Sequence, residues 1–99
     1  MLVSSRKIGE KIAVDKDILI EFLEKTPLTV KIRISIFLKD KIVLYYHYRK
    51  QDIFSCWHGT LKIDEKIIIN NNIEFRILAI DKGAIKVGLE APKQIIIKF

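Results

Sequence analysis

The side chains best suited to covalent or metal chemistry stand together at Cys56, Trp57 and His58. A cysteine next to a histidine suggests a pair of metal ligands or an activated nucleophile. A structural zinc site needs about four ligands, and His47 is the only other cysteine or histidine in the chain. Adjacency in sequence does not make a catalytic pair, and we find no paired carboxylates, glycine-rich phosphate loop or hydrolase motif. We therefore expect a packing role for these residues, with no metal, no cofactor and no enzymatic activity.

Aromatic residues in the middle of the chain offer a second kind of chemistry. Tyr45, Tyr46 and Tyr48 surround His47, and such rings can stack on unpaired bases. A strand of this composition is also typical of a segment that lies half in a core and half in an interface. The sequence alone leaves both interpretations open.

The charge balance favours a polyanionic partner. The chain has 99 residues, enough for one domain, and 18 basic against 12 acidic side chains give it a formal net charge of +6. Its single cysteine excludes an internal disulfide, which suits a reducing cytoplasm. No signal peptide is visible, and no apolar run approaches the roughly 20 residues that span a bilayer. We expect a cytoplasmic protein with no membrane partner.

The elements that position these residues are expected to be short strands. Apolar and polar residues alternate with a period of two, which is the pattern of half-buried strands, and no segment has a helical period. Gly9, Thr26-Pro27 and Pro92 mark turns. The strands are predicted at residues 2–6, 8–14, 18–22, 30–34, 42–48, 84–90 and 94–98, with further polar turns at 15–17, 39–41 and 70–72. The sequence therefore predicts an all-β fold.

The second half of the chain repeats the first. The motif KIGEKI at residues 7–12 recurs as KIDEKI at 62–67, an offset of 55 residues (62 − 7 = 55). The same offset keeps the apolar phase of the following strands, although a slip of one residue would turn every side chain to the other face. About two residues are inserted in the first copy after Ile34. We interpret the chain as an internal duplication with repeats at 1–50 and 56–99 and a connector at 51–55.

Two motifs resemble a known family. MLVSSRKIGEKI at the start and Ala91-Pro92-Lys93 near the end are similar to the carbon storage regulator proteins (CsrA, also called RsmA), which are small bacterial RNA-binding translational regulators. A family member corresponds to one copy of the repeat and forms an intertwined homodimer. The resemblance implies two tandem CsrA-like repeats of about five short strands each, intertwined into one pseudo-dimeric β-sandwich or barrel. It also implies a monomer in solution, because both halves of the dimer are already linked.

The resemblance further implies composite RNA sites, in which the first strand of one repeat lies beside the fifth strand of the other. One site would pair residues 2–7 with 94–98, and the other would pair 57–62 with 42–48. The second site has no Ala-Pro-Lys motif and has Leu61 at the position of Arg6, so we expect one surviving site. Its RNA-binding residues would be Ser4, Ser5, Arg6, Lys7, Ala91, Pro92, Lys93, Ile95, Ile97 and Lys98.

The partner that the resemblance implies is an mRNA or small RNA with GGA in a single strand or hairpin loop, whose translation or stability is controlled. Unpaired loops expose base edges that the main chain of a strand can read, while phosphate contacts from basic side chains set affinity and salt dependence. Two positions depart from the family, which has leucine at the place of Ser4 and arginine at the place of Phe99. The helix that follows in family members is absent from this sequence.

Other interpretations remain open at this stage. Arg6 and Lys7 are also typical of the charged residues on edge strands that prevent aggregation. Lys93 is also typical of a surface turn. The alternative function is a protein-binding module, in which the degenerate second site with residues 45–48 and Trp57 contacts a protein. Such a chain would antagonise a regular family member without binding RNA.

Overall fold

The computed structural model describes residues 1–15, 18–36, 42–46, 49–54, 56–70 and 72–99, and this part of the chain contains strands and no helix. The predicted all-β fold is confirmed. The strands are β1 (Leu2–Arg6), β2 (Lys11–Val14), β3 (Ile18–Lys25), β4 (Thr29–Ile36), β5 (Ile42–Tyr46), β6 (Arg49–Phe54), β7 (Cys56–Lys62), β8 (Lys66–Ile69), β9 (Ile73–Ile80), β10 (Ile85–Glu90) and β11 (Ile97–Lys98).

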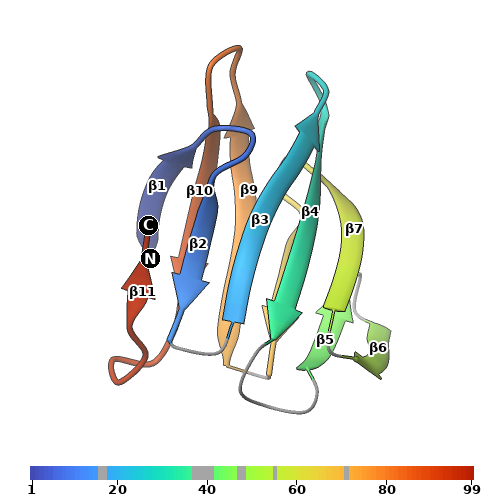
Figure 1. Cartoon of the computed structure of the whole chain (residues 1–99), viewed down its shortest axis with the longest axis vertical. Helices are drawn as coiled ribbons and strands as arrows, with labels where there is room; N and C mark the ends of the chain where they lie inside the picture. Colours follow the sequence, from blue (N-terminus) through green and yellow to red (C-terminus); the bar gives the residue numbers. More distant parts are fainter. Residues whose placement is uncertain (16–17, 37–41, 47–48, 55, 71) are drawn as a thin grey trace.

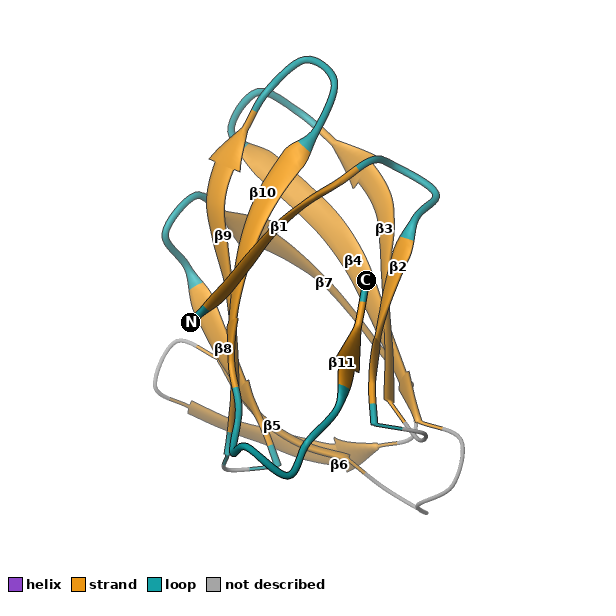
Figure 2. Ribbon diagram, turned by 90° about the vertical axis from the view of Figure 1, so that its left-hand side faces the viewer, coloured by secondary structure: helices purple, strands orange, loops and turns teal. Residues whose placement is uncertain are grey.

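The strands form two antiparallel sheets that pack face to face (Figure 1). The first sheet has the order β1-β10-β9-β8-β5-β6 and the second has the order β11-β2-β3-β4-β7. Figure 2 shows the two layers from the side, with β8, β9 and β10 in one and β2, β3 and β4 in the other. Buried and half-buried residues alternate along β3 and β9, so each strand places every second side chain between the sheets.

Each repeat contributes its first strand to the sheet of the other repeat. Strand β1 pairs with β10, although β8, β9 and β10 all come from the second half of the chain. Strand β7 likewise pairs with β4, beside β3 and β2 from the first half. The two repeats are therefore intertwined in one folding unit, as the resemblance implies.

The two exchanged pairings have the same register. Leu2 lies opposite Leu89 in the first sheet, and Trp57 lies opposite Ile34 in the second. Each residue is related to its counterpart by the offset found in the sequence, since 57 − 2 = 55 and 89 − 34 = 55. An approximate two-fold axis thus exchanges the repeats, which extends the sequence duplication to the geometry of the sheets.

Local irregularities obey the same symmetry. The pairing of β3 with β4 shifts between Phe22 and Glu24, and the pairing of β9 with β10 shifts between Ile77 and Ala79. These positions are again 55 residues apart (77 − 22 = 55; 79 − 24 = 55). A bulge bends a strand and increases its twist, so both repeats curve in the same way.

The turn after the first strand of each repeat is also shared. Gly9 has a φ of 91° and its amide donates a hydrogen bond to the carbonyl of Phe22 at 2.9 Å. Asp64 has a φ of 70°, and its amide donates to the carbonyl of Ile77 at 2.8 Å. The second repeat has lost the glycine but has kept the turn, because aspartate is among the residues that tolerate a left-handed conformation.

The insertion predicted in the first repeat is confirmed. Ile97 of β11 lies opposite Val14, and Leu44 of β5 lies opposite the equivalent residue Ile69 (69 − 14 = 55). Their own separation is 97 − 44 = 53, so the first copy is two residues longer between its fourth and fifth strands.

The structure adds one strand and shortens another. Residues 51–54 of the predicted connector lie in β6, which pairs with β5. Of the predicted final strand only Ile97–Lys98 is extended, because the amide of Ile95 donates a hydrogen bond to the carbonyl of Pro92 at 3.0 Å and turns the chain. The predicted turn residues at 16–17, 39–41 and 71, together with residues 47–48 and 55, lie outside the described residues. The boundaries of the repeats stay a prediction.

The core lies between the sheets and draws on both repeats. Phe22 and Phe75 meet near its middle, with ring centroids 6.1 Å apart and planes tilted by 47°. Both rings are fully buried. The buried apolar side chains among the described residues are Ile12, Val14, Ile18, Ile20, Phe22, Val30, Ile32, Ile34, Leu61, Ile67, Ile69, Ile73, Phe75, Ile77, Ile85, Val87 and Leu89.

We predict that Phe75→Ala lowers the free energy of unfolding by about 3–5 kcal/mol, because the cavity would lie between close-packed sheets. The single tryptophan, Trp57, lies in the other sheet. Its fluorescence and far-UV circular dichroism should still report one common urea transition, since each sheet contains strands of both repeats. Leu28→Ala, at a side chain that is 71% exposed, is the control and should change little. Two separate transitions would contradict the intertwined fold.

An ion pair crosses the outer face of the second sheet. The Nε and Nη2 atoms of Arg33 donate hydrogen bonds to the two carboxylate oxygens of Glu21 at 2.9 Å and 2.8 Å. The two residues lie directly opposite each other in β3 and β4. The hydrogen bond from Arg33 lowers the pKa of Glu21 below its ordinary value of 4.5, and the nearby charges of Arg33, Lys11 and His58 act in the same direction.

We predict that the stabilisation from this pair depends on pH. A carboxyl with a depressed pKa in the folded state adds stability above its unfolded pKa and loses it as the pH falls through the folded value. In a double-mutant cycle of Glu21→Gln and Arg33→Gln, thermal melts at pH 7 should show a favourable coupling that disappears in acid below pH 4.5. Because the pair is partly exposed, the coupling should be small and weaker in high salt. A coupling that is unchanged in acid would contradict the assignment.

Candidate functional site

The chain ends at two open sheet edges. Strand β1 is the outer strand of the first sheet and β11 is the outer strand of the second. Residues 2–7 and 94–98, predicted to lie side by side, are not hydrogen-bonded to each other, since β1 is hydrogen-bonded to β10 and β11 to β2. The physical reason is the turn at Pro92, after which Asp15 holds the chain against β2. The amide of Ile96 donates to the Oδ1 atom of Asp15 at 3.0 Å, and the amide of Asp15 donates to the carbonyl of Ile96 at 2.6 Å.

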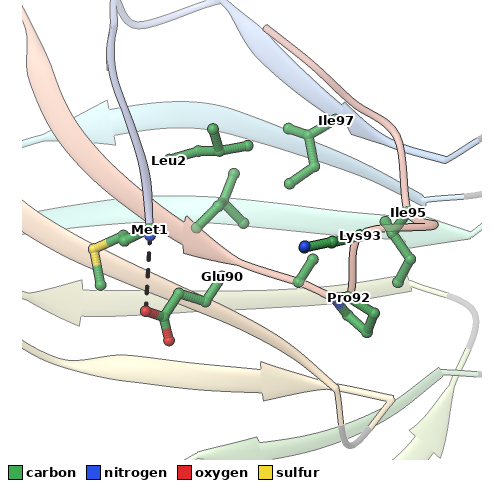
Figure 3. Close-up of a pocket in the computed structure, with 9 residues that line it drawn as sticks. Met1, Leu2, Glu90, Pro92, Lys93, Ile95 and Ile97 are labelled. Atoms are coloured by element: carbon green, nitrogen blue, oxygen red, sulfur yellow. Dashed lines mark ion pairs between the residues drawn. The ribbon is translucent and has the colours of Figure 1, made fainter.

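The two ends nevertheless meet across the gap between the sheets, which we call the terminal seam. Both strands lie at the same side of the molecule and run in the same direction in Figure 1. A pocket of about 280 Å³ opens between them. Figure 3 shows Leu2 and Ile97 on opposite sides of this pocket, with Pro92 and Lys93 near its rim. Its lining residues are Met1, Leu2, Leu89, Glu90, Ala91, Pro92, Lys93, Ile95 and Ile97.

The lining of the pocket mixes apolar and charged groups. Leu89 is buried in the core, and Ile95 and Ile97 pack against the core from the other side. The amino group of Met1 lies 3.9 Å from the Oε1 atom of Glu90 (Figure 3). Lys93 is exposed at the turn. The pocket therefore offers apolar contacts from Leu2, Leu89 and Ile97 together with charged groups of Met1, Glu90 and Lys93.

Arg6 lies farther along the terminal seam than Leu2, on the same side of β1. Its Nε atom donates a hydrogen bond to the carbonyl of Ser5 at 2.8 Å, and its Nη1 atom lies 4.0 Å from the Oε2 atom of Glu10. Its guanidinium carbon lies 5.9 Å from the centre of the Phe99 ring. The guanidinium group of the first repeat thus faces Phe99 at the end of the second repeat.

The other predicted site residues fall into two groups. Ser4 and Ser5 pair with β10, and Lys7 has its amide bound to the Oε1 atom of Glu10 at 2.6 Å. Lys98 is exposed and lies opposite Ala13. The structure brings Ala91, Pro92, Lys93, Ile95 and Ile97 into the pocket itself. Whether these residues bind a ligand stays a prediction.

Sequence reasoning missed four residues of the pocket, namely Met1, Leu2, Leu89 and Glu90. Apolar residues on a strand have no distinctive chemistry, so their pattern indicates a core and nothing more. The start of the chain did carry a signal for this surface. Met1, just before β1, and Leu2, its first residue, are both apolar, yet they are 57% and 51% exposed. Exposed apolar residues on an edge strand are unusual and point to a binding surface.

The equivalent seam at the other side of the molecule has a different structure. The predicted pairing of residues 57–62 with 42–48 is wrong, because β7 pairs with β4 while β5 lies between β8 and β6. Strand β6 covers the edge of β5 that corresponds to the open edge of β11. Leu61, which takes the place of Arg6, is fully buried in the core. Within the part of the chain that the structure describes, this seam thus has β6 in place of the open edge and Leu61 in place of Arg6.

Within the described residues, no three histidine, cysteine, aspartate or glutamate side chains are grouped to hold a metal ion. Cys56 is exposed and its Sγ atom lies 3.9 Å from the Oγ atom of Ser35. The ring of Trp57 lies over Gly59 and packs against the core. The described residues also contain no helix that is long and apolar enough to cross a membrane.

Comparison with known proteins gives a match in the second repeat. The model of the global regulator protein family CsrA matches residues 60–98. The translational regulator CsrA of Thermosipho africanus is 59% identical over 34 residues, which are 34% of this chain and 47% of that protein. The translational regulators CsrA of Thermosipho melanesiensis and Helicobacter pylori are 47% identical over 34 residues and 39% identical over 36 residues, covering 45% and 47% of their own lengths.

The matched region is short. The chain spans about half the length of the curated relatives it matches. No solved structure gives a significant match. The first repeat is therefore linked to the matched segment by the offset in sequence and by the symmetry of the sheets.

We predict that Gly88→Ala displaces Met1 from the rim of the pocket. A Cβ atom at Gly88 would lie 2.5 Å from the Sδ atom of Met1, which is the flexible end of a side chain and can move at little cost in stability. Met1 is the only methionine, so its ¹³C-labelled methyl group gives one NMR signal that should shift strongly. Gly83→Ala, where a Cβ atom meets nothing within 4 Å, is the matched control. An unshifted signal in Gly88→Ala would contradict this position of Met1.

Proposed function

Because residues 60–98 belong to the CsrA family, we propose that this chain is an RNA-binding post-transcriptional regulator. It binds GGA in a single-stranded segment or hairpin loop of an mRNA or small RNA, through one composite site at the terminal seam. Bound RNA controls translation or stability by occupying the message, and no chemical step is required. The observation that carries this proposal is the pocket that both ends of the chain line together.

The open edges of β1 and β11 support recognition of bases. Neither outer edge pairs with another strand among the described residues, so its main-chain amides and carbonyls can form hydrogen bonds with a ligand. Bases in a loop are unstacked and expose their edges, whereas bases in an RNA duplex lie in grooves that side chains cannot read. The pocket between the edges offers both apolar and polar contacts to one base.

The charges around the pocket support binding of the phosphates. Arg6 and Lys7 come from one repeat, and Lys93 and Lys98 come from the other. The exposed lysines can contact phosphate groups without fixing the sequence, which adds affinity and makes binding depend on salt. The net charge of +6 acts in the same direction by steering a polyanion to the protein.

The difference between the two seams supports a stoichiometry of one RNA per chain. A second site would need an open edge at β5 and a cation at the position of Arg6. Strand β6 occupies that edge, and Leu61 is buried at that position. Only the terminal seam therefore has the features that the proposal requires within the described residues.

The test is a titration of a labelled RNA hairpin with GGA in its loop against the same hairpin with CCU. We predict saturation at one RNA per chain, with clear preference for GGA. Arg6→Ala should abolish specific binding, since it removes the cation that reaches both strands of the terminal seam. For a single strand, each lost phosphate contact lowers the slope of log affinity against log salt by about 0.7.

Lys31→Ala is the matched control, because it removes an exposed positive charge from the middle of the second sheet. It should leave the preference for GGA unchanged. Equal and weak binding of both hairpins would contradict the proposal and would favour a protein partner instead. Saturation at two RNAs per chain would contradict the single site.

A further inference from the structure

The contact between Arg6 and Phe99 gives the terminal seam a planar aromatic surface next to the pocket. Phe99 is 44% exposed, and its ring centre lies 5.9 Å from the guanidinium carbon of Arg6. Ile97 lines the pocket, and Phe99 follows it by two residues, so alternation in an extended chain places both side chains on the same side. Leu2 and Arg6 are likewise on one side of β1. The Arg6–Phe99 pair therefore lies farther along the terminal seam, beyond the residues that line the pocket.

The pair is held in place from the side of the first repeat. Arg6 is fixed by its hydrogen bond to the Ser5 carbonyl and by Glu10, which lies 4.0 Å away, and its side chain is only 20% exposed. A cation within about 6 Å of a ring centre attracts the ring face. This attraction favours an orientation in which one face of the Phe99 ring is turned toward Arg6, while much of the residue stays open to solvent.

We propose that Phe99 is a stacking platform for an unpaired base of the bound RNA, next to the base held in the pocket. This inference rests on the proposed RNA-binding function and adds the means by which part of the affinity arises. An aromatic ring stacks on any base and keeps its effect at high salt, whereas a cation at the same place would act through phosphates. The terminal seam would thus combine one cation, Arg6, with one ring.

The first experiment replaces the ring by a side chain of similar apolarity. Phe99→Leu should bind the GGA hairpin about 5- to 150-fold more weakly, because stacking of one base is lost. Phe99→Tyr keeps an aromatic face and should bind within about threefold of the original chain. Ile96→Ala is the control, since Ile96 is also apolar and 61% exposed but lies outside the pocket lining. Thermal melts of all variants check that the fold is retained.

A second readout separates stacking from mere positioning of Arg6. If Phe99 stacks on a base, Phe99→Leu leaves the salt dependence of binding unchanged, and 2-aminopurine at the loop adenine loses its quenching on binding. If Phe99 only orients Arg6, the slope of log affinity against log salt for Phe99→Leu falls in magnitude by about 0.7, and the 2-aminopurine fluorescence is still quenched on binding. This result would overturn the proposal. If Phe99→Leu binds the GGA hairpin within twofold of the original chain, the stacking proposal is also overturned. The proposed RNA-binding function would still stand in that case, provided that the original chain prefers GGA. Failure of the original chain to prefer GGA would end both.

Discussion

The structure depends on the exchange of first strands between the repeats. If β1 did not pair with β10, and β7 with β4, each sheet would lose an edge strand and the core between the sheets would lose its cover. Main-chain hydrogen bonds form between any two strands and do not select the partner of a strand. The register of a strand in a sheet is set by which of its side chains fit the buried rows of isoleucine and valine. Both exchanged pairs keep the same register, although β7 buries Leu61 in the core and no residue of β1 is buried.

The exchange also explains why a binding site can form where the chain begins and ends. Each sheet finishes in a strand that comes from a terminal segment of the chain, and the two finishing strands lie at the same side of the molecule (Figure 1). The resulting pocket takes Leu2 from one repeat and Ile97 from the other. Neither repeat contains this pocket alone, because Met1 and Leu2 come from the first repeat and the other lining residues come from the second.

Much of this fold was predictable from the sequence, since strand alternation and the KIxEKI repeat are local and periodic signals. The strands around Ile20, Ile32 and Val87, the turn at Gly9 and the insertion after Ile34 all follow from them. Strand partners were harder to predict. The pairing of β1 with β10 and the turn at Pro92 depend on contacts between distant residues, such as Asp15 with Ile96, which leave no periodic trace. Strand β6 was missed because its sequence, RKQDIF, has no alternation.

Covalent linkage of the two exchanged halves has a kinetic and evolutionary consequence. In a homodimer with exchanged strands, assembly is second order, and dilution separates the subunits. Here the two halves are parts of one polypeptide, so each has the other at a fixed effective concentration and the exchange needs no second chain. In a homodimer, every substitution also appears in both subunits, at two positions related by the two-fold axis. A single polypeptide can change one side alone, and the burial of Leu61 at the place corresponding to Arg6 is such a one-sided change.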